Sequence, residues 1–164
     1  MANYNIIDYV TVASTGNASD FGDLTAARLH AGGMSNGIRG VFAGGSDTNI
    51  LDYVTIATTG NASDFGDLSS TATDLEGCAS STRGVFTGGK WGNDVLTIEY
   101  ITINSTGNST DFGDLSRDFF SSGVTSNSVT GIVGGGYSPG VSSTNIIEQF
   151  NIASVGNSTD FGDL

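Results

Sequence analysis

Hydrophobic positions recur along the chain in four similar stretches. All four are rich in β-branched and aromatic residues, and each is predicted as a strand: residues 5–12, 50–56, 97–103 and 146–152. In the first stretch Ile6 and Val10 fall on one face of the strand, and Ile7 falls on the other. Apolar residues on both faces are typical of a sheet that is covered on both sides.

A nine-residue signature, Gly-Asn-x-Ser/Thr-Asp-Phe-Gly-Asp-Leu, follows each of these strands. Its copies begin at Gly16, Gly60, Gly107 and Gly156, with spacings of 44, 47 and 49 residues. Such spacings are typical of repeat proteins. The Gly-Asn pair is predicted to reverse the chain through positive φ angles, and the Asp-Phe segment to form a short, acidic outer strand.

Two further strands are predicted in each unit. Residues 25–35 form a Gly-rich segment that we place innermost, where absent side chains let neighbouring backbones approach; Gly32 and Gly33 are matched by Gly77 and Gly123. After a tight turn at residues 36–37, residues 38–45 form a strand that closes on a double glycine. We label the strands of a unit a (Gly-rich), b (ending in Gly-Gly), c (apolar) and d (in the signature). No segment has a helical period.

The chain is therefore predicted to be one repeat domain without helices, 1–164. Residues 1–24 form a half unit with strands c and d, and residues 25–68, 69–115 and 116–164 form complete units. The spacing from Leu24 to Arg39 is 15 residues and recurs in every unit, so the length variation falls between strands b and c. These variable loops, residues 46–48, 90–94 and 137–144, are expected to emerge on one face of the protein.

The variable loops contain the candidate ligand-binding residues. Trp91 and Tyr137 offer flat apolar rings, and their neighbours offer hydrogen-bonding groups, a mixture that suits a sugar. The candidate set is Lys90, Trp91, Asn93, Asp94, Tyr137 and Ser138. The alternative is that the two aromatic side chains only cap the edge of a sheet.

Charge narrows the range of partners. Acidic residues outnumber basic ones 17 to 5, and the net charge is −12. A chain of this charge repels nucleic acid and anionic membranes. The start of the chain has no signal-peptide pattern, and no apolar run approaches about 18 residues. We therefore expect synthesis in the cytoplasm.

Candidate chemistry is sparse. The repeated aspartate pair, Asp20 and Asp23 in the first signature, is interpreted as a turn and edge device, with calcium binding as the alternative. His30 and Cys78 are expected to be packing residues of inner strands, and Arg39 and its equivalents to pair with aspartates. The sequence has no Ser/His/Asp grouping and no His/Cys cluster, so no catalytic residue, metal or cofactor is expected.

The units resemble two kinds of known repeat. Four-stranded units whose second strand closes on a double glycine, followed by a Tyr, resemble kelch repeats, and this implies the blades of a β-propeller. The signature, together with Arg-Gly-Val-Phe-x-Gly-Gly at residues 83–89, resembles repeats of marine phage tail and fibre proteins. These resemblances imply a non-enzymatic structural module of an appendage that presents its variable loops to a carbohydrate or protein receptor. They also imply a final location in a virion or outside the cell.

Two other function classes remain open. One is a propeller enzyme that acts on glycosides through two carboxylates at the axis. Near the predicted inner strands the acids are Asp74, Glu76 and Asp118, at positions that are not equivalent between units. The other is a scaffold that has no ligand.

The number of units predicts self-association. Propellers close with about four to eight blades, whereas this chain carries three complete units and a half. Each open end would expose on the order of 500 Å² of apolar surface, worth about 12 kcal/mol. We therefore expect a homodimer that closes a ring of about six to eight blades through heterologous contacts. The alternatives are a four-bladed ring with one two-stranded blade, or a piece of a longer array.

Overall fold

The computed structural model describes residues 3–91, 96–137 and 143–164, and the described part consists of strands, turns and loops, without helices. The strands are β1 (Tyr4–Tyr9), β2 (Ser19–Arg28), β3 (Gly32–Ser35), β4 (Arg39–Ala43), β5 (Thr48–Thr55), β6 (Ser63–Thr73), β7 (Glu76–Ala79), β8 (Arg83–Thr87), β9 (Lys90–Trp91), β10 (Thr97–Thr102), β11 (Thr110–Asp114), β12 (Gly123–Ser126), β13 (Thr130–Gly134), β14 (Ile146–Asn151) and β15 (Thr159–Asp163).

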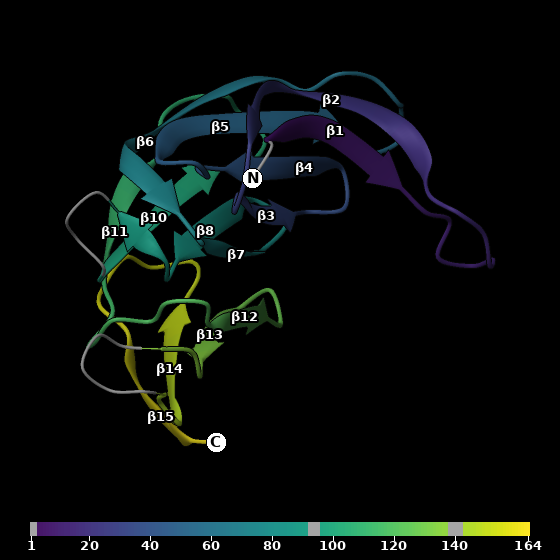
Figure 1. Cartoon of the computed structure of the whole chain (residues 1–164). Coiled ribbons are helices and arrows are strands. Elements are labelled where there is room, and N and C mark those ends of the chain that lie inside the picture. The colour runs from purple at the N-terminus through teal and green to yellow at the C-terminus, as the bar shows by residue number, and fades with distance from the viewer. Residues whose placement is uncertain (1–2, 92–95, 138–142) are drawn as a thin grey trace.

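The strands form four antiparallel sheets in the order predicted from the repeats. The half unit is β1-β2, the first unit is β3-β4-β5-β6 with β9 added, the second is β7-β8-β10-β11 and the third is β12-β13-β14-β15. The sheets follow one another along an arc, with the half unit at one end and the third unit at the other (Figure 1). Within the described residues this arc does not close into a ring.

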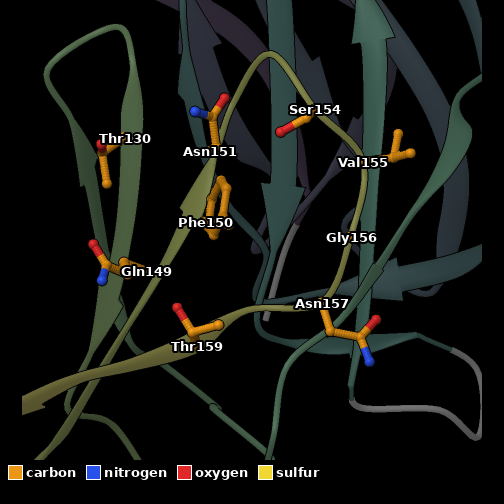
Figure 2. Close-up of a pocket in the computed structure, with 9 residues that line it drawn as sticks. All are labelled: Thr130, Gln149, Phe150, Asn151, Ser154, Val155, Gly156, Asn157 and Thr159. Carbon is orange, nitrogen blue, oxygen red and sulfur yellow. The ribbon is translucent and has the colours of Figure 1, made fainter.

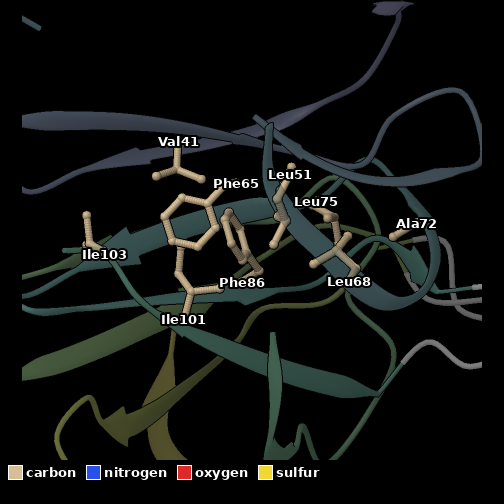
Figure 3. Close-up of a cluster of buried hydrophobic side chains, with 10 residues drawn as sticks. Val41, Leu51, Phe65, Leu68, Ala72, Leu75, Phe86, Ile101 and Ile103 are labelled. Atoms are coloured by element: carbon tan, nitrogen blue, oxygen red, sulfur yellow. The ribbon is translucent and has the colours of Figure 1, made fainter. Parts of the chain in front are cut away.

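The hydrophobic core lies between successive sheets. Between the first and second units, Phe65 and Leu51 of one sheet face Phe86 and Ile101 of the next (Figure 3). A second cluster fills the space between the second and third units, around Phe112. Apolar residues on both faces of strand c are therefore needed in the second unit, because its sheet packs on the first unit on one side and on the third unit on the other.

The outer strand d is longer than predicted in the half unit and in the first unit. β2 contains ten residues and β6 eleven, and both run on into the segment that the sequence assigned to strand a. Gly22 has a φ of +148°, and a register shift in the β1–β2 pairing lies next to it, so a β-bulge accommodates the Gly-Asp step and pairing then resumes. The prediction of a short strand d was therefore wrong for these two strands, whereas β11 and β15 contain only five residues each. Strand a is four residues long in each complete unit.

The Gly-rich strands β3, β7 and β12 pack against one another on the inner side of the arc. A Cβ on Gly32 would lie 2.8 Å from the carbonyl oxygen of Leu75, and one on Gly77 would lie 2.9 Å from that of Gly33. Crowding of the inner strands is thus confirmed at these two glycines. Gly123 has open space instead, because it belongs to the last sheet of the arc.

The signature connects neighbouring units, which pattern reading did not reveal. Between the first and second units, the N–H groups of Gly107 and Ser109 donate to the carbonyl oxygens of Phe65 and Asp67, at 2.7 and 2.9 Å. The Asn108 side-chain oxygen accepts from the Asp67 N–H at 3.1 Å. The other two junctions repeat these three bonds with nearly the same lengths. The signature asparagine therefore binds the preceding strand d, and positive φ is found at the glycine before it.

A buried acid on strand c makes a second connection at each junction. Thr25 donates from its N–H and its hydroxyl to the Asp52 carboxylate, at 3.1 and 2.7 Å. Ser69 makes the same pair of bonds to Glu99, and so does Ser116 to Glu148. These carboxylates are at most 1% exposed. They satisfy backbone and hydroxyl donors that the contact between sheets removes from water.

Cys78 is buried on β7, as expected of a packing residue. Burial raises the pKa of its thiol from 9.0 to about 11, and a hydrogen bond with the Ser126 side chain partly opposes this rise. In the unfolded chain the thiol ionises near its ordinary pKa of 9.0. Folding therefore favours the protonated thiol, and the stability that this provides is lost as the pH rises through about 11.

This pKa shift predicts a pH-dependent difference between the wild-type protein and the Cys78→Ala variant. The difference in free energy of unfolding is expected to be constant below pH 9.0 and to shrink as the pH rises to about 11. Urea unfolding at a series of pH values measures it. A difference that stays constant up to about pH 11 would contradict the assignment.

Candidate functional site

The variable loops are anchored in the same way in all three complete units. The N–H of Ser46 donates to the Leu29 carbonyl at 2.9 Å, and Tyr137 exchanges two backbone bonds with Phe120, both of 2.9 Å. Lys90, at the equivalent position of the second unit, pairs with Thr73. The first residue of each loop is thus bonded to the segment that joins strands d and a. All three loops therefore begin at the same edge of the arc, as the repeat spacing predicted.

A double glycine makes each anchor possible. Gly45 has a φ of +92°, and its Cβ would lie 2.5 Å from the carbonyl oxygen of Leu29. Gly89 and Gly136 have φ values of +70° and +86° and approach the d-to-a connection equally closely. Any side chain at these positions would strain the backbone and collide with the connection. The Gly-Gly pair is therefore a device that anchors the loops.

The candidate ligand-binding residues are only partly described. Lys90 is exposed at the start of its loop, the backbone of Trp91 lies in β9, and the Tyr137 side chain is 48% exposed with its ring 6.4 Å from that of Phe120. Asn93, Asp94 and Ser138 lie outside the described residues. Lys90 and Tyr137 occupy equivalent positions on neighbouring units, so the structure places them on the same edge.

A polar hollow of about 240 Å³ opens at this same edge. It is lined by His30, Ala31, Asp74, Leu75, Glu76, Ser121 and Ser122. His30, Asp74 and Ser121 each follow directly on the residue that anchors a variable loop, and all three have positive φ. The hollow and the loops are therefore parts of one surface, which we call the loop face.

His30 is not the packing residue that the sequence predicted. Its side chain is 58% exposed, and Nδ1 lies 2.7 Å from the Asp74 carboxylate. It stands in the link between β2 and β3, with a φ of 59°, instead of within an inner strand. The hollow thus assembles a His, two carboxylates and two serines that are up to 92 positions apart in the sequence (His30 to Ser122). Equivalent positions of successive repeats converge there, since His30, Asp74 and Ser121 each lie six residues after the leucine that ends a signature. Alignment of the repeats by sequence identifies these positions as equivalent, and the structure shows that they meet.

The arginines also differ from their prediction. Arg39 stacks 4.6 Å from the centre of the Tyr53 ring and donates to the Ile103 carbonyl of the next unit at 2.9 Å. Arg83 repeats both contacts, with Tyr100 and the carbonyl oxygen of Ile152. They therefore bind aromatic rings and backbone, and not aspartates, because strand b brings them beside strand c of the same unit.

The third unit has Thr130 and Gln149 in place of this Arg-Tyr pair. A second hollow, of about 390 Å³, opens beside them, and the turn at residues 154–157 forms its other wall (Figure 2). A smaller hollow, of about 170 Å³, lies at the same place in the second unit, where Tyr100 lines it. The hollow is therefore a feature of the repeat that is larger in the third unit, because Thr130 and Gln149 are shorter than the Arg-Tyr pair. The simultaneous loss of that pair in one repeat was the sequence signal for the larger size. The hollow lies at the edge of the arc opposite the variable loops, where strands c and d are connected.

The repeated aspartates have local structural roles. Asp64 Oδ1 accepts from the Gly66 N–H at 3.2 Å, and Asp160 does the same with Gly162 at 3.1 Å. Among the described residues no group of three or more His, Cys, Asp or Glu side chains is placed to hold a metal ion. Nor does any described segment form a helix that is long and apolar enough to cross a membrane.

Comparison of the chain with protein-family models and with curated proteins gave no match.

Proposed function

We propose that this protein is a non-enzymatic structural and binding module. In this proposal the sheets are kelch-like blades of a β-propeller in a phage tail fibre or similar appendage, and the loop face binds a carbohydrate or protein receptor on a cell surface. The protein would reach this place in a virion, or outside the cell, after synthesis in the cytoplasm. The observation that carries the proposal is the anchoring of variable loops at one edge by an invariant backbone arrangement.

The physical argument rests on a contrast between rigid and variable parts. Buried cores between sheets and repeated junction bonds fix the base of each loop, whereas the loops themselves differ in length and composition between units. Binding residues are commonly found on loops that a rigid scaffold positions. The neighbouring hollow adds hydroxyl, carboxylate and imidazole groups, which suit the hydroxyls of a sugar.

Binding to glycan arrays and to host cells tests this proposal. Trp91→Ala and Tyr137→Ala are expected to weaken retention by about 10-fold or more, because aromatic anchors dominate binding energy. Ile38→Ala is the control, since Ile38 is 66% exposed in the turn between β3 and β4, at the opposite edge of the arc. Unchanged binding by both aromatic variants would contradict the use of the loop face. If Gln149→Ala lost binding instead, the ligand would occupy the hollow of Figure 2.

A glycoside-active enzyme is the second candidate, because the hollow on the loop face brings Asp74 and Glu76 together beside His30. Glycosidases use two carboxylates on opposite sides of the bond that is cleaved. Hydrolysis of bacterial polysaccharides that is abolished by Glu76→Gln would favour this function over binding alone. No hydrolysis, with binding retained, would favour the receptor-binding module.

A further inference from the structure

The two ends of the arc carry complementary halves of the junction that occurs three times inside it. Each internal junction places a signature turn of one unit on strand d of the unit before it. The half unit carries the signature residues of such a turn, Gly16-Asn17-Ala18, and the third unit has such a strand, β15. Within the described residues neither one is bonded to a neighbouring unit in this way. We propose that the third unit of one chain binds the half unit of a second copy through this same junction.

Phe161 shows that the acceptor strand is incomplete. The equivalent phenylalanines are 9% exposed in β2 and 2% in β6 and β11, where a following unit covers them, whereas Phe161 is 54% exposed. Leu164 is 76% exposed, although its equivalents Leu68 and Leu115 are 2% exposed. The open face of the third unit therefore repeats the apolar pattern of faces that are buried elsewhere in the same chain, which identifies it as an interaction surface.

The half unit presents the matching surface at the other end of the arc. Val10 and Val12 are 57% and 96% exposed, whereas their equivalents in the third unit, Phe150 and Ile152, are 4% and 1% exposed. In the third unit these positions pack against the second unit. The half unit can therefore place two apolar side chains on β15 and its neighbours in the way that the junction between the second and third units does.

The hydrogen bonds of the proposed contact follow from the internal junctions. Gly16 and Ala18 would donate their N–H groups to the carbonyl oxygens of Phe161 and Asp163, and the Asn17 side-chain oxygen would accept from the Asp163 N–H. In all three internal junctions a glycine in strand d lets the two backbone segments approach closely. A Cβ on Gly113 would lie 2.5 Å from the Gly156 carbonyl oxygen, whereas a Cβ on Gly162 has nothing within 4 Å. Gly162 thus keeps clear a space that only the second copy would enter.

This contact is heterologous, because different surfaces of the two chains meet. Two copies that are joined at both ends close a ring, and copies joined at one end extend a filament. The inference concerns assembly and does not depend on whether the loop face binds a receptor. It places two or more loop faces in one particle, which would raise the avidity of any receptor binding.

Association of the purified 164-residue chain tests the inference. We expect native mass spectrometry and sedimentation to give at least twice the 16.7 kDa of one chain. Gly162→Ala and Asn17→Ala are each expected to raise the dissociation constant about 10-fold or more, the first by steric overlap and the second by leaving the Asp163 N–H unpaired. Gly37→Ala is the control, since Gly37 also has positive φ and open space, but lies in the turn between β3 and β4. Circular dichroism checks that each variant is folded.

Mixing the two variants gives the sharpest test. The Gly162→Ala chain keeps an intact half unit, and the Asn17→Ala chain keeps an intact third unit, so an equimolar mixture can form one unaltered junction. We expect the mixture to associate more tightly than either variant alone. A monomeric wild-type chain at high concentration would overturn the inference, as would association that neither variant weakens or that mixing fails to restore.

Discussion

Replacing Phe112 with alanine is expected to destabilise the protein by about 3–5 kcal/mol, the usual cost of removing a buried aromatic side chain. Phe112 is 2% exposed, and its ring lies edge-on to Tyr100 and to Phe150, with centroids 6.1 and 5.6 Å away. Tyr100 belongs to the second unit and Phe150 to the third. The truncation would therefore open a cavity at the contact between two sheets, and would weaken the attachment of the third unit as well as the core.

Phe161→Ala is the matched control, because the same residue type occupies the same place in the signature but is 54% exposed. In the separated chain its effect is expected to stay within about 0.5 kcal/mol. Urea unfolding followed by circular dichroism, at concentrations below those of association, compares the two variants. Equal losses of stability would show that the junction does not bury Phe112 more than the open end buries Phe161.

Asp52→Ala is expected to cost about 3–5 kcal/mol, because it leaves a buried arginine without its counter-ion. Arg28 Nη1 lies 2.8 Å from Asp52 Oδ2, and both side chains are fully shielded from solvent. Among the described residues, Nε and Nη2 of Arg28 have no hydrogen-bond partner. The Asp52 carboxylate is therefore the group that stabilises the positive charge of Arg28. Thr25 would lose its acceptor at the same time.

The other units suggest both a control and a rescue. Asp8→Ala alters the equivalent acid of the half unit, which is exposed, and should change the free energy of unfolding by no more than about 0.5 kcal/mol. The junction between the first and second units has Ser69, Ala72 and Glu99 in place of Thr25, Arg28 and Asp52, and the Ser-Glu bonds remain. The triple variant Thr25→Ser, Arg28→Ala, Asp52→Glu should therefore lose less than about 2 kcal/mol. A triple variant as unstable as Asp52→Ala would mean that the ion pair itself is required.

Repeat spacing was a reliable guide wherever the same local pattern recurs. It predicted the four strands of a unit, their order, and the edge from which the variable loops emerge, because strand periodicity and Gly-Gly turns are encoded within a few residues. It also located the crowding at Gly32 and Gly77. It did not predict that β2 and β6 continue through the signature, since the bulge at Gly22 depends on how strand c pairs with strand d.

The sequence by itself determined an all-β chain of repeated four-stranded sheets with two unlike ends. Only the tertiary structure decided which residues meet between the sheets: Asn108 with Asp67, Arg39 with Ile103, and His30 with Asp74. These partners lie more than 40 positions apart, the separation of one repeat, and their contact depends on how successive sheets are stacked. Local hydrophobic patterns specify a strand and its faces, but the partner across a junction is set by the packing of whole units.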